Sequence, residues 1–363
     1  MKYSFLEHPN TYCPAQSSED PGRWYAADVY AKRHREMAGN FPHKAKGHLL
    51  IAKIEAMPVI GLVAGILEEI AIDLFANWVD HRKMRSNLKE AFTQHTGPEI
   101  ARWNEIDHTP ANNIRVEISQ AENQGAKDRM EDRATNYTDP KGCIGCIFDG
   151  HLGSGVADFL ERKRFSIEQE YVRIRMRQQF RCLQNEISQN RSLDNQGSTA
   201  TVVAIDTQKG LATTATVGDS YAFLYRKVKG RIVAIPLSPV RNWHHEKEIK
   251  RAQETTPDFQ PVASIKKPRF YGFEVSRSLG DQIPEQNTDN IFSRSPKVTE
   301  IALQVNDIIV VASDGLWDTK KQSDIIQAIN PSSNDIAGDI INTINLSARN
   351  QDNVAIVAMR ILN

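Results

Sequence analysis

Three short apolar segments of this 363-residue chain each end in an aspartate that a small residue follows. They are residues 146–150, 215–220 and 310–315, with Asp149, Asp219 and Asp314 as the aspartates. An Asp-Gly pair after a strand is also ordinary turn chemistry, so one instance alone would carry little weight. Repetition at three segment ends predicts that the folded chain gathers carboxylates on one edge of a β-structure.

Further acidic residues extend this set. Asp352 precedes the apolar segment 354–359, and the pair Glu131 and Asp132 follows Met130. In an antiparallel sandwich the strand ends meet at two rims, where neighbouring carboxylates repel one another. Divalent cations relieve that repulsion, and all-oxygen ligands favour Mg²⁺ or Mn²⁺ over zinc. Because two such ions sharing a carboxylate suit phosphate-ester hydrolysis, the residues predict a two-metal hydrolase.

Hydrophobic patterning predicts an α+β layered sandwich. Short β-like segments cover residues 114–119, 201–205, 211–217 and 308–312, and helical stretches cover 155–188 and 322–347. Strands with intervening helices and no regular βαβ alternation are typical of this class. Hydrophobic residues make up 40% of the chain, enough for a substantial core.

The N-terminal third has a different character. Residues 48–95 show helical periodicity, and residues 107–113 form a polar, proline-bearing stretch typical of a linker. We therefore expect a helical N-terminal domain over 1–112, with a localisation or regulatory role, and a second domain over 113–363. The apolar dozen 56–67 predicts a buried helical hairpin, with peripheral membrane contact through residues 48–80 as the alternative. Charged residues crowd it too closely for a membrane span.

Charge and cysteine content narrow the class of protein. Forty-five Lys and Arg residues balance 45 Asp and Glu residues, whereas nucleic-acid coats and polybasic membrane arms need surplus positive charge. The chain has 4 cysteines, and its N-terminus lacks the apolar core of a secretory leader. We expect a cytoplasmic monomer with no nucleic-acid partner, with membrane association and secretion as a bacterial effector as alternative locations. Cys143 and Cys146 are expected to be core residues on opposite faces of a strand.

Seven short motifs, in order and correctly spaced, resemble the metal-dependent Ser/Thr protein phosphatases of type 2C. They are Met130-Glu131-Asp132, Phe148-Asp149-Gly150-His151, Gly197-Ser198-Thr199-Ala200, Val217-Gly218-Asp219-Ser220, Val275–Asp281, Ala312–Asp318 and Asp352-Asn353. The resemblance covers roughly residues 113–363. It implies a β-sandwich of two antiparallel sheets flanked by helices, with two Mg²⁺ or Mn²⁺ ions in a cleft between the sheets and a third held more loosely.

The resemblance also implies roles for individual residues. Asp149 would bridge two ions, Gly150 would give its carbonyl oxygen to one, and Asp314 and Asp352 would hold the other. Glu131 would act through metal-bound water, with Asp132 supporting it; Asp219 would hold the third ion, with Asp318 beside it. His151 would protonate the leaving alkoxide. The implied reaction is hydrolysis of phosphoserine and phosphothreonine by attack of a metal-bridging hydroxide, with phosphoproteins as partners.

Three positions depart from the family pattern. Lys127 stands where the family has the arginine that clamps the substrate phosphate, so the positive charge remains but the two-pronged guanidinium is lost. Tyr221 replaces an arginine after the Gly-Asp-Ser motif, and Leu237–Arg241 lacks an Asp-His pair. Two alternatives therefore stay open. One is a catalytically weak scaffold that binds phosphoproteins, and the other is an enzyme for small phosphate esters.

Two basic segments are further candidates for substrate contact. Residues 241–270 occupy the variable flap region of the family, and their basic residues either contact phosphoproteins or are merely solvated. These are His244, His245, Lys247, Lys250, Arg251, Lys266, Lys267 and Arg269. The stretch 162–181 is predicted to be a half-buried helix with a solvated basic face.

Overall fold

The computed structural model describes residues 78–363, apart from residue 140 and the segments 166–171, 255, 257–258, 260–267, 271–272, 283–290 and 345–350. The chain divides into two compact units, Met1–Val79 and Asp80–Asn363, and the second contains nearly all of the described residues. The predicted apolar hairpin lies outside the described residues, so its membrane contact stays a prediction. No helix of the described part is long and apolar enough to cross a membrane.

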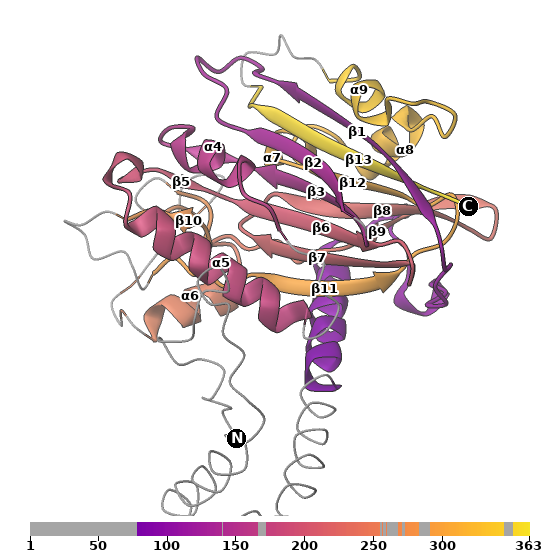
Figure 1. Cartoon of the computed structure of the whole chain (residues 1–363), viewed down its shortest axis with the longest axis horizontal. Coiled ribbons are helices and arrows are strands. Elements are labelled where there is room, and N and C mark those ends of the chain that lie inside the picture. Colours follow the sequence, from indigo (N-terminus) through magenta and orange to yellow (C-terminus); the bar gives the residue numbers. More distant parts are fainter. Residues whose placement is uncertain are drawn as a thin grey trace, which may run out of the picture. The chain divides into compact units, whose positions relative to one another are not determined.

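Two five-stranded antiparallel sheets form the centre of this unit (Figure 1). The first has the order β1 (Arg115–Asn123), β13 (Val354–Leu362), β12 (Ile308–Ala312), β8 (Tyr221–Val228) and β9 (Arg231–Pro236). The second has the order β11 (Lys297–Ala302), β7 (Leu211–Val217), β6 (Ala200–Asp206), β3 (Gly142–Phe148) and β2 (Arg133–Asp139). The predicted strand segments at 114–119, 201–205, 211–217 and 308–312 are thereby confirmed.

Alternation along β3 shows how the sequence builds the layers. Cys143 and Ile147 belong to the core between the two sheets, together with Leu224, Val311 and Val357 from the first sheet. The intervening residues Ile144, Cys146 and Phe148 face the opposite way, into a second core. Side chains in a strand point alternately to its two faces, so a strand buried on both sides is apolar throughout. The prediction that the two cysteines are core residues is confirmed.

Helices cover the outer faces of both sheets, giving four layers (Figure 1). The second sheet packs against α4 (Gly155–Glu161) and α5 (Val172–Ser188), which bury Leu160, Phe180 and Ile187. The first packs against α7 (Asp314–Trp317), α8 (Gln322–Ala328) and α9 (Ile336–Ile341), which bury Leu316, Ile325 and Ile340. The structure thus confirms the predicted α+β sandwich of two antiparallel sheets flanked by helices.

The predicted helix over 322–347 is two shorter helices. Pro331 lies between α8 and α9, and the residue before a proline disfavours helical backbone angles. The Asp335 side chain then accepts a hydrogen bond from the Gly338 amide at 2.9 Å and caps the start of α9. The predicted helix over 155–188 is likewise divided, into α4 and α5.

Smaller elements complete the unit. A three-stranded sheet has the order β10 (Leu279–Gly280), β5 (Gly197–Ser198) and β4 (Gly150–His151). The described part of the unit also has the short helices η4 (Trp103–Glu105), η5 (Arg191–Leu193) and α6 (Glu246–Gln253). Although β4 has two residues, it carries the candidate site residues Gly150 and His151 just beyond the end of β3.

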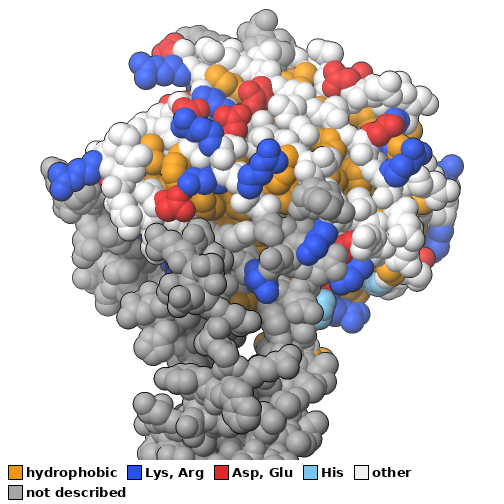
Figure 2. Space-filling model, viewed as in Figure 1, with side chains coloured by type: hydrophobic (Ala, Val, Ile, Leu, Met, Phe, Trp, Pro, Cys, Tyr) orange, Lys and Arg blue, Asp and Glu red, His pale blue; other side chains and the backbone are white. Residues whose placement is uncertain are grey.

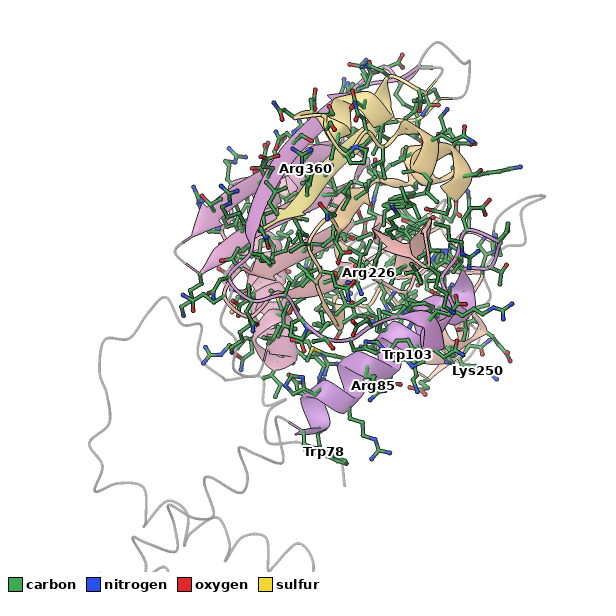
Figure 3. The ribbon with its side chains drawn as sticks, turned by 90° about the vertical axis from the view of Figure 1, so that its right-hand side faces the viewer. Trp78, Arg85, Trp103, Arg226, Lys250 and Arg360 are labelled. Atoms are coloured by element: carbon green, nitrogen blue, oxygen red, sulfur yellow. The ribbon has the colours of Figure 1, made fainter. Side chains whose placement is uncertain are left out.

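Residues 80–112 fold with the sandwich, although the sequence predicted a boundary at 112/113. In the helix over residues 78–94, Leu88 is buried in the core between the sheets, and the Asn87 amide donates to the Val298 carbonyl at 2.8 Å. Arg85 of this helix lies 5.6 Å from the ring centre of Trp103 (Figure 3). The compact unit therefore begins at Asp80 because these side chains bury apolar surface against it.

The predicted linker 107–113 is held by buried hydrogen bonds. Arg226, 3% exposed, forms a salt bridge with Asp307 at 2.6 Å and donates to the Asp107 carbonyl at 2.9 Å (Figure 3). The Ala111 amide donates to the Leu303 carbonyl at 2.8 Å. A buried arginine needs such a set of acceptors, so this stretch is an anchored segment of the domain. A separate N-terminal domain remains a prediction for the residues before 78.

Candidate active site

Strand register brings the predicted acidic residues to one rim of the sandwich. Arg133 at the start of β2 pairs with Phe148 at the end of β3, so the flanking Asp132 and Asp149 share this rim. On the first sheet, Ala312 at the end of β12 pairs with Ile356 near the start of β13. Asp314 follows β12 and Asp352 precedes β13, so these two aspartates also lie at one rim. Asp219 follows the end of β7, which pairs with the start of β6. Segments far apart in sequence thus place their carboxylates together.

The electrostatics of Asp149 and Asp132 reflect this crowding. Burial raises the pKa of Asp149 well above its ordinary 3.8, and the charges of Asp132, Asp314, Asp219 and Asp352 raise it further. Burial, with the charges of Asp314 and Asp352, raises the pKa of Asp132 to about 7 despite hydrogen bonds from Ser313 and with Asp149. Burial and the neighbouring negative charges therefore both disfavour ionisation of these two carboxyl groups.

The donor set fits a hard divalent cation. Within the described residues, no three His, Cys, Asp or Glu side chains already stand as a formed metal-binding group. Asp132 is 2% exposed, however, and its Oδ2 is buried without a hydrogen-bond partner in the described part of the chain. Buried carboxylate oxygens cost free energy unless a proton, a donor or a cation satisfies them. Carboxylate oxygens are the ligands of Mg²⁺ and Mn²⁺.

Close backbone packing places Gly150 and Glu131 together. A Cβ added at Gly150 would lie 2.5 Å from the Glu131 carbonyl oxygen, so a larger residue would force the two segments apart. The Glu131 amide donates to Asn353 Oδ1 at 2.8 Å, and Asn353 Nδ2 donates to the Arg129 carbonyl at 3.0 Å. Asn353 directly follows Asp352, so these hydrogen bonds hold the loop before β2 close to Asp352.

Lys127 lies at the same rim. Its ammonium forms an ion pair with Asp352 Oδ1 at 2.7 Å, with both side chains about half exposed. Burial acts to lower the pKa of Lys127, but the hydrogen bond to Asp352 and the charges of Asp352, Asp314 and Asp149 outweigh it and raise the pKa. The lysine is therefore a firmly charged group beside the carboxylates.

His151, the predicted acid, contacts a residue to which sequence reasoning gave no role. Its Nε2 lies 2.8 Å and 3.0 Å from the two carboxylate oxygens of Asp281. Asp281 ends the Val275–Asp281 motif, and that motif was the available signal. Its proximity to His151 depends on the pairing of β10 with β5 and of β5 with β4, which no local pattern predicts.

Tyr221 and Asp318 lie near Asp219, where the resemblance implies a third ion. Burial raises the pKa of the Tyr221 hydroxyl, and the charges of Asp318, Asp219 and Asp314 raise it further. The Tyr221 ring stacks on Trp317 with centres 4.9 Å apart. Tyr221 thus serves aromatic packing where the family has an arginine.

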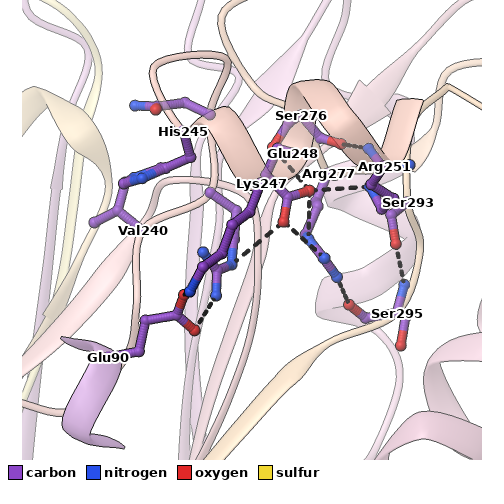
Figure 4. Close-up of polar contacts among 12 residues, drawn as sticks. Glu90, Val240, His245, Lys247, Glu248, Arg251, Ser276, Arg277, Ser293 and Ser295 are labelled. Carbon is purple, nitrogen blue, oxygen red and sulfur yellow. Dashed lines mark hydrogen bonds and ion pairs between the residues drawn. The ribbon is translucent and has the colours of Figure 1, made fainter. Parts of the chain in front are cut away.

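The flap contains a buried ion network (Figure 4). Glu248 of α6, 2% exposed, accepts hydrogen bonds from Arg277 at 2.8 Å and Arg251 at 3.1 Å, and Arg241 Nε lies 3.5 Å away. Arg241 also contacts Glu90 of the helix over residues 78–94, at 2.5 Å. Arg241 is therefore a structural residue, and this network holds the flap against the domain.

Most described basic residues of the flap are ion-paired within the domain. The pairs are Lys247 with Glu90, Lys250 with Glu246, Arg251 with Glu248, and His244 and Arg269 with Glu274. His245 lies 3.3 Å from the Gln94 amide nitrogen, and Lys266 and Lys267 lie outside the described residues. On the face shown in Figure 2, basic and acidic side chains are interspersed. The prediction that the flap contacts substrate remains a prediction.

Comparison with known proteins decides the family. The sequence model described as Protein phosphatase 2C matches residues 116–354, about two-thirds of the chain. The chain belongs to the protein phosphatase 2C family. Protein phosphatase 1L of Bos taurus is 29% identical over 231 residues, which cover 57% of this chain and 61% of that protein. Probable protein phosphatase 2C 62 of Oryza sativa is 26% identical, over 69% of this chain and 86% of that protein.

The match to other relatives of this phosphatase 2C chain is partial. It spans 25% of a probable protein phosphatase of Dictyostelium discoideum and 39% of probable protein phosphatase 2C 67 of Arabidopsis thaliana. Among solved structures, the serine/threonine phosphatase of S. agalactiae matches with a TM-score of 0.51 and 19% identity, over 69% of this chain and 100% of that one. A likeness at this identity establishes the shared fold.

Proposed function

We propose that this protein is a metal-dependent protein serine/threonine phosphatase. The observation that carries the proposal is the gathering of Asp132, Asp219, Asp314 and Asp352 around Asp149 at one rim, where burial and their charges raise the pKa of Asp149. The family match supports the same reaction class, since its relatives carry protein phosphatase names. Phosphoserine and phosphothreonine proteins are the corresponding substrates.

Each residue at the rim has a task in this proposal. Asp149, the Gly150 carbonyl, Asp314 and Asp352 would hold two Mg²⁺ or Mn²⁺ ions, with Glu131 and Asp132 supporting them and Asp219 holding a third. Such ions, when bound, lower the pKa of water and neutralise phosphate charge. Lys127 would attract the substrate phosphate, and His151 would give a proton to the departing serine or threonine oxygen. A general acid suits this step because an alkoxide is a poor leaving group.

Phosphate release from a phosphothreonine peptide tests the proposal. We expect release with Mn²⁺, its loss on addition of excess EDTA, and its return when Mn²⁺ is restored. We also expect Mn²⁺ to raise the melting temperature, because a ligand that binds only the folded state stabilises it. Absence of release from folded protein that shows this Mn²⁺-dependent stabilisation would overturn the enzymatic proposal and favour a phosphoprotein-binding scaffold.

Lys127→Arg tests the departure from the family pattern. A guanidinium can form two parallel hydrogen bonds with phosphate, whereas an ammonium acts as a point charge. We expect kcat/KM for the phosphopeptide to rise by about 2- to 10-fold, mostly through a lower KM, since one added hydrogen bond contributes about 0.5–1.5 kcal/mol net. Lys229→Arg, at an exposed turn, is the matched control. A fall in kcat/KM would show that the Lys127–Asp352 pair matters more than phosphate geometry.

A further inference from the structure

The pair formed by His151 and Asp281 is unusually well enclosed. Both carboxylate oxygens of Asp281 lie within 3.0 Å of His151 Nε2. The Asp281 side chain is fully buried, whereas that of His151 is 20% exposed. Nε2 of His151 is therefore engaged with a buried carboxylate, so Nδ1 is the ring nitrogen that remains to contact a substrate.

Asp281 is itself fixed by its neighbours. The Ser278 hydroxyl donates to Asp281 Oδ2, and the Asp281 amide donates to the Gln196 carbonyl at 2.9 Å. Asp281 has a φ of +52°, in the left-handed region, which aspartate occupies more readily than most residues with a side chain.

The small sheet provides space for this pair. Gly197 of β5 pairs with His151 on one side and with Gly280 on the other. A Cβ added at Gly197 would overlap both His151 Nε2 and Asp281 Oδ1, so the contact depends on a glycine at this position. The Phe273 ring, centred 5.0 Å from the His151 ring, packs against the imidazole. Hydrogen bonding and packing together restrict the orientation of the imidazole.

We propose that Asp281 is a positioning residue that holds His151 Nε2 and directs Nδ1 to the oxygen leaving the phosphate. This role rests on the proposed phosphatase activity. As the ester P–O bond breaks, the Nδ1 proton passes to the serine or threonine oxygen, while a water oxygen forms the new bond to phosphorus. The products are a free hydroxyl group and inorganic phosphate. The attacking water releases one proton to solvent, solvent restores the proton on Nδ1 for the next turnover, and the other ring proton stays on Nε2, hydrogen-bonded to Asp281.

Leaving-group dependence distinguishes positioning from a structural role. A threonine alkoxide needs a proton as it departs, whereas p-nitrophenolate is stable without one. General-acid catalysis contributes about 10²- to 10⁴-fold, and misorientation forfeits part of it. With Asp281→Asn we expect kcat for a phosphothreonine peptide to fall about 10- to 100-fold with KM unchanged. For p-nitrophenyl phosphate, which reports the rest of the site, we expect kcat to fall by less than about 3-fold.

Two further variants complete the test. Ser278→Ala keeps the carboxylate but removes a donor that fixes it, so we expect a smaller loss with the same dependence on leaving group. Residues that act as a unit are non-additive, so Asp281→Asn should have little further effect in a His151→Gln background. Equal losses on both substrates would assign Asp281 a structural role, and no loss on either would also overturn the proposal. A wild-type protein inactive on both substrates would contradict the proposed function instead.

Discussion

Asp149→Asn should stabilise the metal-free protein while it removes metal-dependent phosphate release. Asp149 is surrounded by Asp132, Asp219, Asp314 and Asp352, and burial together with these charges raises its pKa. The folded state therefore binds this proton more tightly than the unfolded state does. It follows that Asp149 makes the metal-free protein lose stability as the pH rises from about 3.8 through the raised folded pKa.

An asparagine at this position carries no charge, so the repulsion disappears and the pH dependence from this group disappears with it. Asp132, whose pKa is about 7, continues to lower stability as the pH rises from about 3.8 to 7. In a domain of this size, each kcal/mol of stabilisation raises the melting temperature by about 2–4 °C. We therefore expect the melting temperature of Asp149→Asn to exceed that of the wild type by about 2–4 °C or more at pH 7.5 in EDTA, and to differ little from it at pH 4.

Although Asp149→Asn should make the metal-free protein more stable, it should lower the metal-dependent activity. Lewis-acid stabilisation by a bound metal is worth several kcal/mol, so losing a shared ligand should lower kcat about a thousandfold or more. The rise in melting temperature on adding Mn²⁺ should also shrink. Both quantities can be measured on one preparation, by phosphate release and by thermal unfolding with and without Mn²⁺.

Asp206→Asn is a matched control for this experiment. Asp206 ends β6 of the same sheet and pairs with Gly142 at the other rim, and it accepts hydrogen bonds from the Gln208 and Lys209 amides. We expect it to leave activity and the Mn²⁺ response unchanged. If Asp149→Asn kept wild-type activity, or destabilised the metal-free protein at pH 7.5, the carboxylate rim could not be the metal site that we propose.

Glu248→Gln should produce the largest loss of stability outside the rim. The Glu248 carboxylate lies among Arg241, Arg251 and Arg277, and Arg241 and Arg277 are themselves 1% and 6% exposed. Removing one partner of a buried ion pair leaves an uncompensated charge and costs about 3–5 kcal/mol. An amide keeps the shape of the side chain, so the loss would come from charge rather than from packing.

The pH dependence gives this prediction a second readout. Burial acts to raise the pKa of Glu248, but Arg277, Arg251 and Arg241 outweigh it and lower the pKa from 4.5 to about 2. The stability that this group contributes is complete above its unfolded pKa and is lost as the pH falls from about 4.5 to about 2. Because the amide of the Glu248→Gln variant would not titrate, we expect the variant to lose less stability than the wild type across this window.

Glu246→Gln on the same helix is the control. Glu246 and Lys250 form a surface pair with side chains 79% and 68% exposed, and solvent screening leaves such pairs little effect on stability. Urea unfolding of both variants at pH 7 should therefore show a large shift for Glu248→Gln and almost none for Glu246→Gln. Equal shifts, or a wild-type midpoint for Glu248→Gln, would contradict the structural role of the network.

The sequence by itself determined the fold class and the positions of the acidic residues. Apolar segments of strand length predicted β6, β7 and β12 because the side chains that a doubly buried strand needs are encoded locally. Asp149, Asp219 and Asp314 were found for the same reason, since each directly follows such a segment. Their meeting at one rim could also be inferred, because antiparallel strands alternate in direction.

Tertiary structure decided what depends on contacts between distant segments. The domain starts at Asp80 because Leu88 enters the core between the sheets and Asn87 donates to Val298 of β11, 211 residues further along the chain. Likewise, basic flap residues are ion-paired because the fold brings Glu90 and Glu274 beside them and places Glu248 of α6 beside Arg241. The pairing of His151 with Asp281 requires three short strands and a glycine between them. Such contacts leave no local periodicity, because the partners are set by register and burial rather than by neighbouring residues.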